Sequence, residues 1–288
     1  MTIAANSSRL DDPFGLVGRV LAEKFRAESV VARGGFGVLY KGTHLTLQRP
    51  IAIKVLRTSE KLHGSMRDAV RAAFEREAQM VARLSHPAIV HVIEYGVEPA
   101  PDAPLLWMVL EWIEGKPLSV VLRERNGQRY TPAEAMDLMR PVLQALAHAH
   151  DEGLAHRDLK PANIMVTPTR RGPSVKLIDF GIAKAMDEGE AASDGDTQTQ
   201  SVMAVYSPRY AAPEQVGRAR TGPWTDVHAL GLILTEMLVG HPAYTSPASE
   251  STALMAEVLN PQRPTPGRVG IDAGGWEAVD VGLAAVRE

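Results

Sequence analysis

The first third of the chain alternates apolar and polar residues with the period of a β-strand. Within residues 25–56, two apolar runs flank a group of glycines, and the run Ile51, Ile53, Val55 alternates with Ala52, Lys54, Leu56. A period of two is typical of strands, so we expect this region to form a small sheet. Residues 89–97 and 105–113 predict two more strands, and residues 66–84 show the apolar spacing of an amphipathic helix.

After Gly115 the pattern changes to that of helices. The segment Thr131-Pro132-Ala133-Glu134 predicts a capping box with proline at the first helical position, and Pro141 further on predicts a bend or a split in the helix that follows. Residues 164–167 and 175–178 predict a short hairpin. Residues 224–240 are nearly all apolar, which predicts a buried helix.

A strand-rich beginning followed by a helix-rich remainder favours an α+β fold in two lobes. We expect one lobe over residues 14–110 and the other over residues 111–288, with a hinge at 111–117 where a ligand cleft would lie. The small and polar residues 1–13 predict a flexible tail.

Composition narrows the function classes. The chain has 288 residues, of which 45% are hydrophobic and 23% charged, values typical of a globular protein. The net charge of −3 gives no support for a nucleic-acid partner, and the chain has no cysteine for a thiol nucleophile or a Cys-based zinc site. The longest apolar run, residues 229–239, is too short to span a bilayer, so we expect no membrane segment and a cytoplasmic location.

Three glycines, Gly34, Gly35 and Gly37, lie between two expected strands. Glycine lets backbone N–H groups approach phosphate oxygens closely. The same residues also suit a plain hairpin turn, and taken alone they favour that interpretation.

Two charged residues fall at positions that the pattern makes apolar. Lys54 lies in a strand with apolar residues on both faces, and Glu77 lies on the apolar face of the expected helix. Buried charges are stable only when paired, so we expect these two side chains to meet. The alternative is that both lie at the edge of the buried zone and reach water.

Two further segments carry oxygen ligands and titratable groups. One is His156-Arg157-Asp158-Leu159-Lys160-Pro161-Ala162-Asn163, and the other is Asp179-Phe180-Gly181, after a short strand. The carboxylates of Asp158 and Asp179 and the amide of Asn163 suit Mg²⁺ and a hydroxyl proton. Either segment alone could occur by chance, but the two together in this order form a highly specific family signature.

With these motifs, the chain resembles the serine/threonine protein kinases, in particular the eukaryotic-like kinases of bacteria. The matching set is the glycine-rich loop, Ala52-Ile53-Lys54, Glu77, the two segments above and Ala212-Pro213-Glu214. The resemblance implies a two-lobed kinase fold, with an antiparallel-sheet N-lobe that holds one helix and a larger helical C-lobe. It also implies an activation segment over residues 179–214.

The resemblance implies a role for each site residue. Lys54, held by Glu77, would grip the α- and β-phosphates of the co-substrate ATP. Asp158 would accept the substrate hydroxyl proton, and Lys160 would steady the transferred phosphoryl group. Asp226 resembles the helix residue that ties down the catalytic loop. The remaining residues would bind Mg²⁺ (or Mn²⁺) or line the adenine pocket: Asn163 and Asp179 for the metal; Leu110 as gatekeeper, Glu111 to Ile113 as backbone partners, and Val38, Ala52 and Met165 around the ring.

Regulation and partners follow from the same resemblance. Autophosphorylation in the loop 187–207, by a second copy of the kinase, is expected to activate the enzyme, with Thr197, Thr199 and Ser201 as the sites. The expected substrates are proteins. Kinases of this family continue through further helices with an arginine that pairs with the glutamate at Glu214. Ending at Glu288 therefore predicts a truncated chain, a fragment of a larger sensor or a shortened C-lobe. The chain could also be the cytoplasmic part of a longer, membrane-anchored receptor.

Two alternatives of other classes remain at this stage. The chain could be a pseudokinase or kinase fragment that acts as a nucleotide-dependent binding or scaffold module. The presence of Lys54, Glu77, Asp158, Asn163 and Asp179 opposes this reading. It could also phosphorylate a small molecule, although the Ala212-Pro213-Glu214 segment and the long loop before it favour a protein substrate.

Overall fold

The structure is a computed structural model of the chain. It describes residues 11–34, 37–56, 65–98, 104–170, 172–180, 208–217, 219–246 and 251–260. These residues fall into two compact units: the first contains residues up to 82 together with 91–112, and the second contains residues 83–90 and the described residues from 113 onward.

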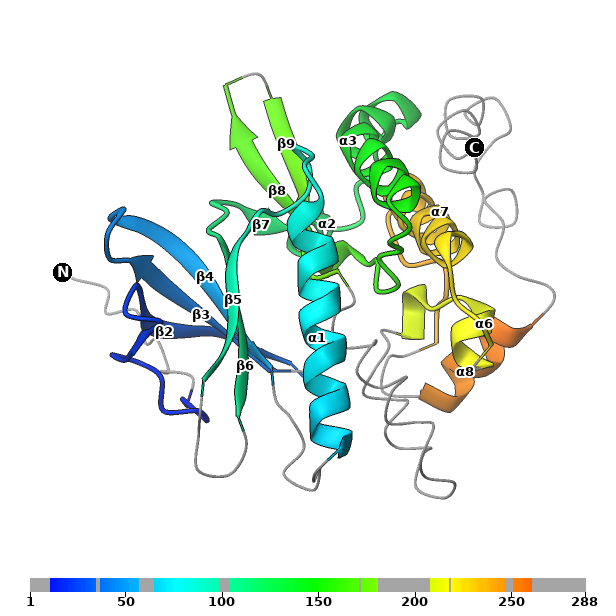
Figure 1. The fold of residues 1–288 in the computed structure, drawn as a ribbon. Helices are drawn as coiled ribbons and strands as arrows, with labels where there is room; N and C mark the ends of the chain where they lie inside the picture. Colours follow the sequence, from blue (N-terminus) through cyan, green and yellow to red (C-terminus); the bar gives the residue numbers. More distant parts are fainter. Residues whose placement is uncertain are drawn as a thin grey trace. The chain divides into compact units, whose positions relative to one another are not determined.

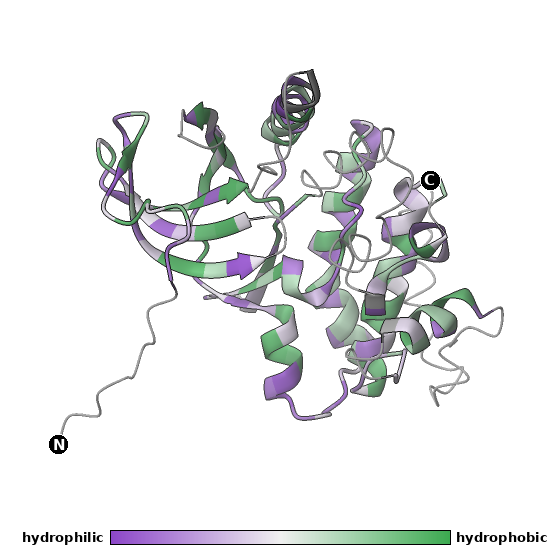
Figure 2. Ribbon diagram, turned by 90° about the horizontal axis from the view of Figure 1, so that it is seen from below, coloured by the Kyte–Doolittle hydropathy of each residue, from purple (hydrophilic) through white to green (hydrophobic). Residues whose placement is uncertain are grey.

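An antiparallel sheet of six strands forms the first unit, in the order β1-β2-β3-β4-β6-β5 (Figure 1). The strands are β1 (Val20–Leu21), β2 (Phe25–Gly34), β3 (Gly37–His44), β4 (Arg49–Leu56), β5 (Val92–Glu98) and β6 (Leu105–Glu111). Hydrophobic and hydrophilic residues are mixed along these strands (Figure 2), and the buried ones form a core that includes Phe25, Tyr40, Ile53, Trp107 and Val109. The strands expected between residues 25 and 56 are confirmed, and the one expected over 105–113 is confirmed as far as Glu111.

Helix α1 (Ser65–Arg83) confirms the helix expected over residues 66–84. Its Phe74 is fully buried and meets the ring of Tyr95 in β5 edge to face, with 6.2 Å between ring centroids. This contact fixes the helix against the sheet, so the apolar stripe in the sequence faces the core.

The segment from Arg83 to Val90 belongs to the second unit. Ile89 pairs with Leu177, and the Leu177 backbone both donates to Ala88 and accepts from Val90. The strand expected from residue 89 therefore begins only at Val92, because residues 88–90 make their backbone hydrogen bonds elsewhere.

Helices dominate the second unit. They are α2 (Leu118–Glu124), α3 (Pro132–Asp151), α6 (Pro213–Val216), α7 (Pro223–Val239) and α8 (Ser251–Leu259), with short 3₁₀ turns η1 (Pro161–Asn163) and η2 (Pro208–Tyr210). A three-stranded sheet of β7 (Lys116–Pro117), β8 (Ile164–Thr169) and β9 (Gly172–Leu177) completes it. The expected hairpin is thus confirmed as β8 and β9.

Helix α3 begins as its sequence predicts. The Thr131 hydroxyl accepts from the Glu134 N–H at 3.2 Å, and the Glu134 carboxylate accepts from the Thr131 N–H at 2.8 Å. The helix then runs through Pro141 without a break, so the alternative of a split is wrong. Proline removes one helical hydrogen bond, whereas Met139 and Val142 on either side are completely buried, and their packing keeps the helix in one piece.

Helix α7 confirms the buried apolar helix. Leu230, Ile233 and Leu234 are almost fully inaccessible, and Gly240 in a left-handed conformation ends the helix. Among the helices of the described ranges, none has the length and apolar character to cross a membrane.

Candidate active site

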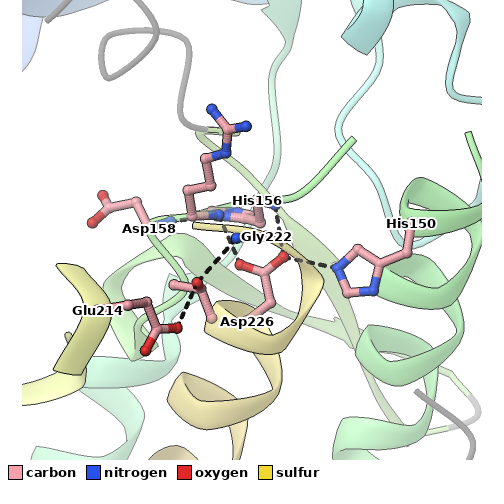
Figure 3. Close-up of polar contacts among 8 residues, drawn as sticks. His150, His156, Asp158, Glu214, Gly222 and Asp226 are labelled. Carbon is pink, nitrogen blue, oxygen red and sulfur yellow. Dashed lines mark hydrogen bonds and ion pairs between the residues drawn. The ribbon is translucent and has the colours of Figure 1, made fainter. Parts of the chain in front are cut away.

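A buried carboxylate organises the loop that follows α3. Asp226, in the first turn of α7, has no exposed surface. It accepts hydrogen bonds from the backbone N–H groups of His156 and Arg157, both at 2.7 Å (Figure 3). These charge-assisted bonds offset the loss of hydration and fix the start of the loop.

Arg157 adopts a left-handed conformation, with φ of 60°. For a residue with a side chain this conformation costs on the order of 1–3 kcal/mol and persists only where the surroundings enforce it. Asp226 supplies part of that enforcement by holding the Arg157 N–H. The next residue in the chain, Asp158, receives its orientation from this constrained backbone.

His150 is a site residue that sequence analysis missed. Its Nε2 lies 2.8 Å from Asp226 Oδ2, and its side chain is only 8% exposed. His150 lies at the end of α3. With the N–H groups of His156 and Arg157, it is the third group that contacts the Asp226 carboxylate (Figure 3). No feature of the sequence distinguishes His150 from the chain's other histidines, because its role depends on the approach of α7.

His156 joins the loop to the segment that carries Asp179. Its Nε2 donates to the Ile178 carbonyl at 3.0 Å, its Nδ1 accepts from the Asp158 N–H at 3.3 Å, and its ring lies 4.7 Å from that of Phe180. Burial lowers the pKa of His156 and outweighs the nearby carboxylates of Asp226 and Asp158, which raise it. Because Nδ1 accepts and Nε2 donates, these contacts fit the tautomer with its proton on Nε2.

Asp158, Lys160 and Asn163 form one hydrogen-bonded cluster. Lys160 Nζ lies 2.8 Å from Asp158 Oδ2, and Asn163 Nδ2 donates to the same oxygen at 3.1 Å and to the Asp158 carbonyl at 2.8 Å. The side chains of Lys160 and Asp158 are 23% and 17% exposed. A carboxylate that is oriented by two donors and still reaches solvent is suited to accept a proton from a bound hydroxyl.

The same segment offers oxygen atoms for a cation. Because the Asn163 NH₂ group faces Asp158, its side-chain carbonyl oxygen is the atom suited to a metal. The Ile178 N–H donates to the Asn163 main-chain carbonyl at 2.9 Å, which ties Asn163 to the residue before Asp179. An amide oxygen and a carboxylate are the donors that Mg²⁺ or Mn²⁺ prefers, so these residues fit such an ion.

The Ala212-Pro213-Glu214 motif opens helix α6, and its polar groups contact both α7 and the loop. The Glu214 carboxylate accepts from the Thr225 hydroxyl at 2.8 Å, and that hydroxyl accepts from the Gly222 N–H at 3.2 Å (Figure 3). The next residue, Gln215, bonds to Ala212 and Arg157. The sequence pattern does not point to Thr225 or Gln215, although Gln215 directly follows the motif.

The first unit contains Lys54 and Glu77. Lys54 is half-buried in the middle of β4, opposite Leu39 of β3 and Met108 of β6. Glu77 lies in α1 and is 8% exposed. The burial of Glu77 agrees with the expectation from the pattern, and direct pairing of the two side chains remains a prediction.

Gly34 and Gly37 face each other at the end of the β2–β3 hairpin. A Cβ atom on Gly37 would lie 2.0 Å from the Val55 carbonyl oxygen, whereas a Cβ on Gly34 would meet nothing within 4 Å. Packing of the sheet therefore requires glycine at position 37, and open space surrounds position 34. Gly35 lies outside the described residues, as do Thr197, Thr199 and Ser201.

Three expected adenine-pocket residues lie in neighbouring strands of the first unit. Val38, Ala52 and Leu110 are all buried, and Ala52 pairs directly with Leu110. The Glu111 N–H donates to the His91 carbonyl at 3.0 Å, so an adenine contact at Glu111 would use its carbonyl oxygen. Ile113 and Met165 belong to the second unit.

Comparison with known proteins agrees with this geometry. Residues 25–265 match the family described as "Protein kinase domain". The chain is 33% identical to serine/threonine-protein kinase PknB of Mycobacterium tuberculosis over 253 residues, which is 88% of this chain and 38% of that protein. It is also 33% identical to serine/threonine-protein kinase pkn3 of Myxococcus xanthus over 259 residues, 89% of this chain and 45% of that protein.

The chain thus spans less than half the length of these relatives. The match includes both the sheet of the first unit and the helices of the second. On its motifs, its fold and these matches, the chain belongs to the protein kinase family and is similar to bacterial serine/threonine-protein kinases.

Proposed function

We propose that this chain transfers the γ-phosphoryl group of ATP to serine or threonine hydroxyls of proteins. The observation that carries the proposal is the cluster in which Lys160 and Asn163 orient the Asp158 carboxylate. In the reaction the substrate oxygen bonds to the γ-phosphorus, the bond to the β–γ bridging oxygen breaks, and ADP leaves. The hydroxyl proton passes to Asp158.

Phosphoryl transfer needs positioning and charge neutralisation more than covalent help. Lys160 lies beside the proposed base and supplies a positive charge for the transferred group. Asn163 and Asp179 would hold Mg²⁺, which when bound neutralises charge on the phosphate oxygens. His156 and Asp226 contact the backbone of this loop and keep its side chains in place.

For the nucleotide, we propose that Lys54 contacts the α- and β-phosphates and that Glu77 supports it. Gly34, Gly35 and Gly37 would bring backbone N–H groups to the phosphates. Val38, Ala52, Leu110 and Met165 would enclose the adenine ring, with Glu111 and Ile113 as its hydrogen-bonding partners. The burial of Val38, Ala52 and Leu110 supports an apolar adenine site.

We further propose that a second copy of the kinase phosphorylates Thr197 or Thr199, with Ser201 as the third candidate. Support comes from their position between Asp179-Phe180-Gly181 and Ala212-Pro213-Glu214 and from Arg157, which could bind the phosphate. A cytoplasmic location is proposed because ATP and protein substrates are available there.

Labelled ATP tests the proposed reaction. The chain and its Asp158→Asn variant are incubated with [γ-³²P]ATP, Mg²⁺ and a serine- and threonine-rich acceptor protein, and nucleotide binding is measured separately. Loss of the general base is expected to lower the transfer rate by about 10²–10⁴-fold, with nucleotide affinity retained.

The matched control is Asp151→Asn, which makes the same change at an exposed position at the end of α3 and is expected to leave the rate unchanged. Lys54→Met is expected to reduce both transfer and nucleotide affinity. An Asp158→Asn variant as active as the parent would contradict the mechanism. Nucleotide binding without transfer in the parent would favour a binding module instead.

A further inference from the structure

Gln215 is a buried polar residue that the proposed chemistry does not use. Its side chain is in helix α6, and the residue is 4% exposed. Both ends of its amide are engaged: Oε1 accepts from the Ala212 N–H at 3.0 Å, and Nε2 donates to the Arg157 carbonyl at 2.8 Å. A backbone donor on one side and a backbone acceptor on the other fix which end of the amide is oxygen.

The Arg157 carbonyl belongs to the peptide group that joins Arg157 to Asp158. The other polar atom of this group is the Asp158 N–H, which donates to His156 Nδ1 at 3.3 Å. A peptide group is a rigid plane, so a hydrogen bond at each end fixes its rotation. Gln215 therefore supplies one of the contacts that orient the peptide plane between Arg157 and Asp158.

The strain at Arg157 makes this contact more important. Arg157 has φ of 60°, and the Asp226 carboxylate holds its N–H. Asp226 binds the N–H of Arg157, whereas Gln215 binds its carbonyl oxygen. Restraint on both sides of a strained residue is what keeps it in a sparsely populated conformation.

We propose that Gln215 is a positioning residue for Asp158. Its side chain holds the Arg157 carbonyl and links it to Ala212 of the Ala212-Pro213-Glu214 motif. This inference deepens the proposed function and rests on it. Gln215 acts through the peptide backbone and does not touch the reacting atoms. Its loss should therefore misplace Asp158 without changing the nucleotide site.

Two variants of the full chain test the proposal. Gln215→Met keeps the length of the side chain and removes both hydrogen bonds. Gln215→Glu keeps the acceptor for Ala212 but places a carboxylate oxygen against the Arg157 carbonyl. The control is Gln144→Met, which makes the same change at an exposed position of α3.

Steady-state kinetics are expected to show that kcat for an acceptor protein falls about tenfold in Gln215→Met, as for the loss of one well-placed hydrogen bond, while KM for ATP stays within about twofold. For Gln215→Glu, activity relative to the parent is expected to recover as the pH falls from about 8 to about 6. Burial against a carbonyl favours the protonated carboxyl group, whose O–H can replace the amide donor. The activity of Gln215→Met relative to the parent should not change with pH, because methionine does not titrate.

Hydrogen–deuterium exchange supplies a readout that does not depend on activity. The peptide that covers residues 154–163 is expected to exchange about tenfold faster in Gln215→Met than in the parent, while peptides from α3 are unchanged. If the parent does not transfer phosphate but this exchange difference is present, the proposed function fails and the positioning contact stands.

Two results would overturn the positioning role. One is parental kcat and parental exchange in both variants. The other is loss of the folded far-UV circular dichroism spectrum in both variants, which would make Gln215 a packing residue. The positioning role would be established by three results in folded variants: a lower kcat, faster exchange of residues 154–163, and pH-dependent recovery of activity in Gln215→Glu.

Discussion

The Glu214 carboxylate accepts a hydrogen bond from the hydroxyl of Thr225 at 2.8 Å, although the resemblance to kinases predicts an arginine partner from beyond Glu288. Thr225 is 1% exposed and also accepts from the Gly222 N–H. A neighbouring threonine in the described part of the second unit thus supplies one hydrogen-bond donor to the glutamate. Thr225 directly precedes Asp226, so the start of α7 contacts both α6 and the loop that contains His156 and Arg157.

Replacing Thr225 with valine tests this contact. Valine preserves the shape but removes the hydroxyl, which leaves the Glu214 carboxylate and the Gly222 N–H without this partner. We expect the free energy of unfolding to fall by about 1–3 kcal/mol, measured by urea unfolding. Thr225→Ser retains the hydroxyl and is expected to lose less than Thr225→Val; equal losses would show that packing, not the hydrogen bond, matters.

The β2–β3 hairpin allows a second prediction with a built-in control. Gly37→Ala places a Cβ atom 2.0 Å from the Val55 carbonyl oxygen, so β3 and β4 must separate. Overpacking of this kind costs about 1–3 kcal/mol, and we expect a lower melting temperature in differential scanning fluorimetry. Gly34→Ala meets nothing within 4 Å and is expected to melt as the parent does. A similar melting temperature for both variants would contradict the close approach.

Stability should depend on pH through His156. Burial lowers the pKa of His156 below the ordinary 6.5, so below about that pH the unfolded chain binds a proton that the folded chain does not. The free energy of unfolding should therefore fall as the pH drops from about 7.5 to about 5.5, by at most about 1.4 kcal/mol per pH unit for each such group. His86, whose pKa is also lowered mainly by burial, adds to the slope.

Urea unfolding of His156→Phe across this pH range is expected to give a shallower slope than the parent. Phenylalanine keeps an aromatic ring beside Phe180 but does not titrate. His241→Phe, at an exposed position, is the control and should keep the parental slope. A parental slope in His156→Phe would show that another group determines the acid sensitivity.

The proposed phosphorylation sites give a fourth prediction. Mass spectrometry after incubation with ATP and Mg²⁺ is expected to find phosphate on Thr197 or Thr199. The double change Thr197→Ala, Thr199→Ala should lower transfer to an added protein and leave nucleotide affinity nearly intact, because a phosphate adds about two negative charges that Arg157 could bind. The double change Thr167→Ala, Thr169→Ala, in β8, is the matched control for phosphate incorporation. If the Thr197→Ala, Thr199→Ala variant is as active as the parent, phosphorylation at these two sites does not regulate the kinase.

Local patterns in the sequence were sufficient for most of the secondary structure. The alternation around Lys54 has the period of a strand, and the capping box at Thr131 and the apolar run of α7 mark helices through residues that are near neighbours in the chain. The motifs around Asp158 and Asp179 specified the family, because these residue types at this spacing are rare by chance. Pro141 shows the limit of local rules, since the packing of α3 keeps the helix intact across it.

Only the tertiary structure decided which side chains support those motifs. His150 reaches Asp226 across 76 positions, and Gln215 reaches Arg157 across 58. The local pattern around a histidine or a glutamine does not say which distant backbone group it will meet. That depends on how α3, α6 and α7 pack, and their packing brings polar groups together inside a core where each buried donor and acceptor needs a partner.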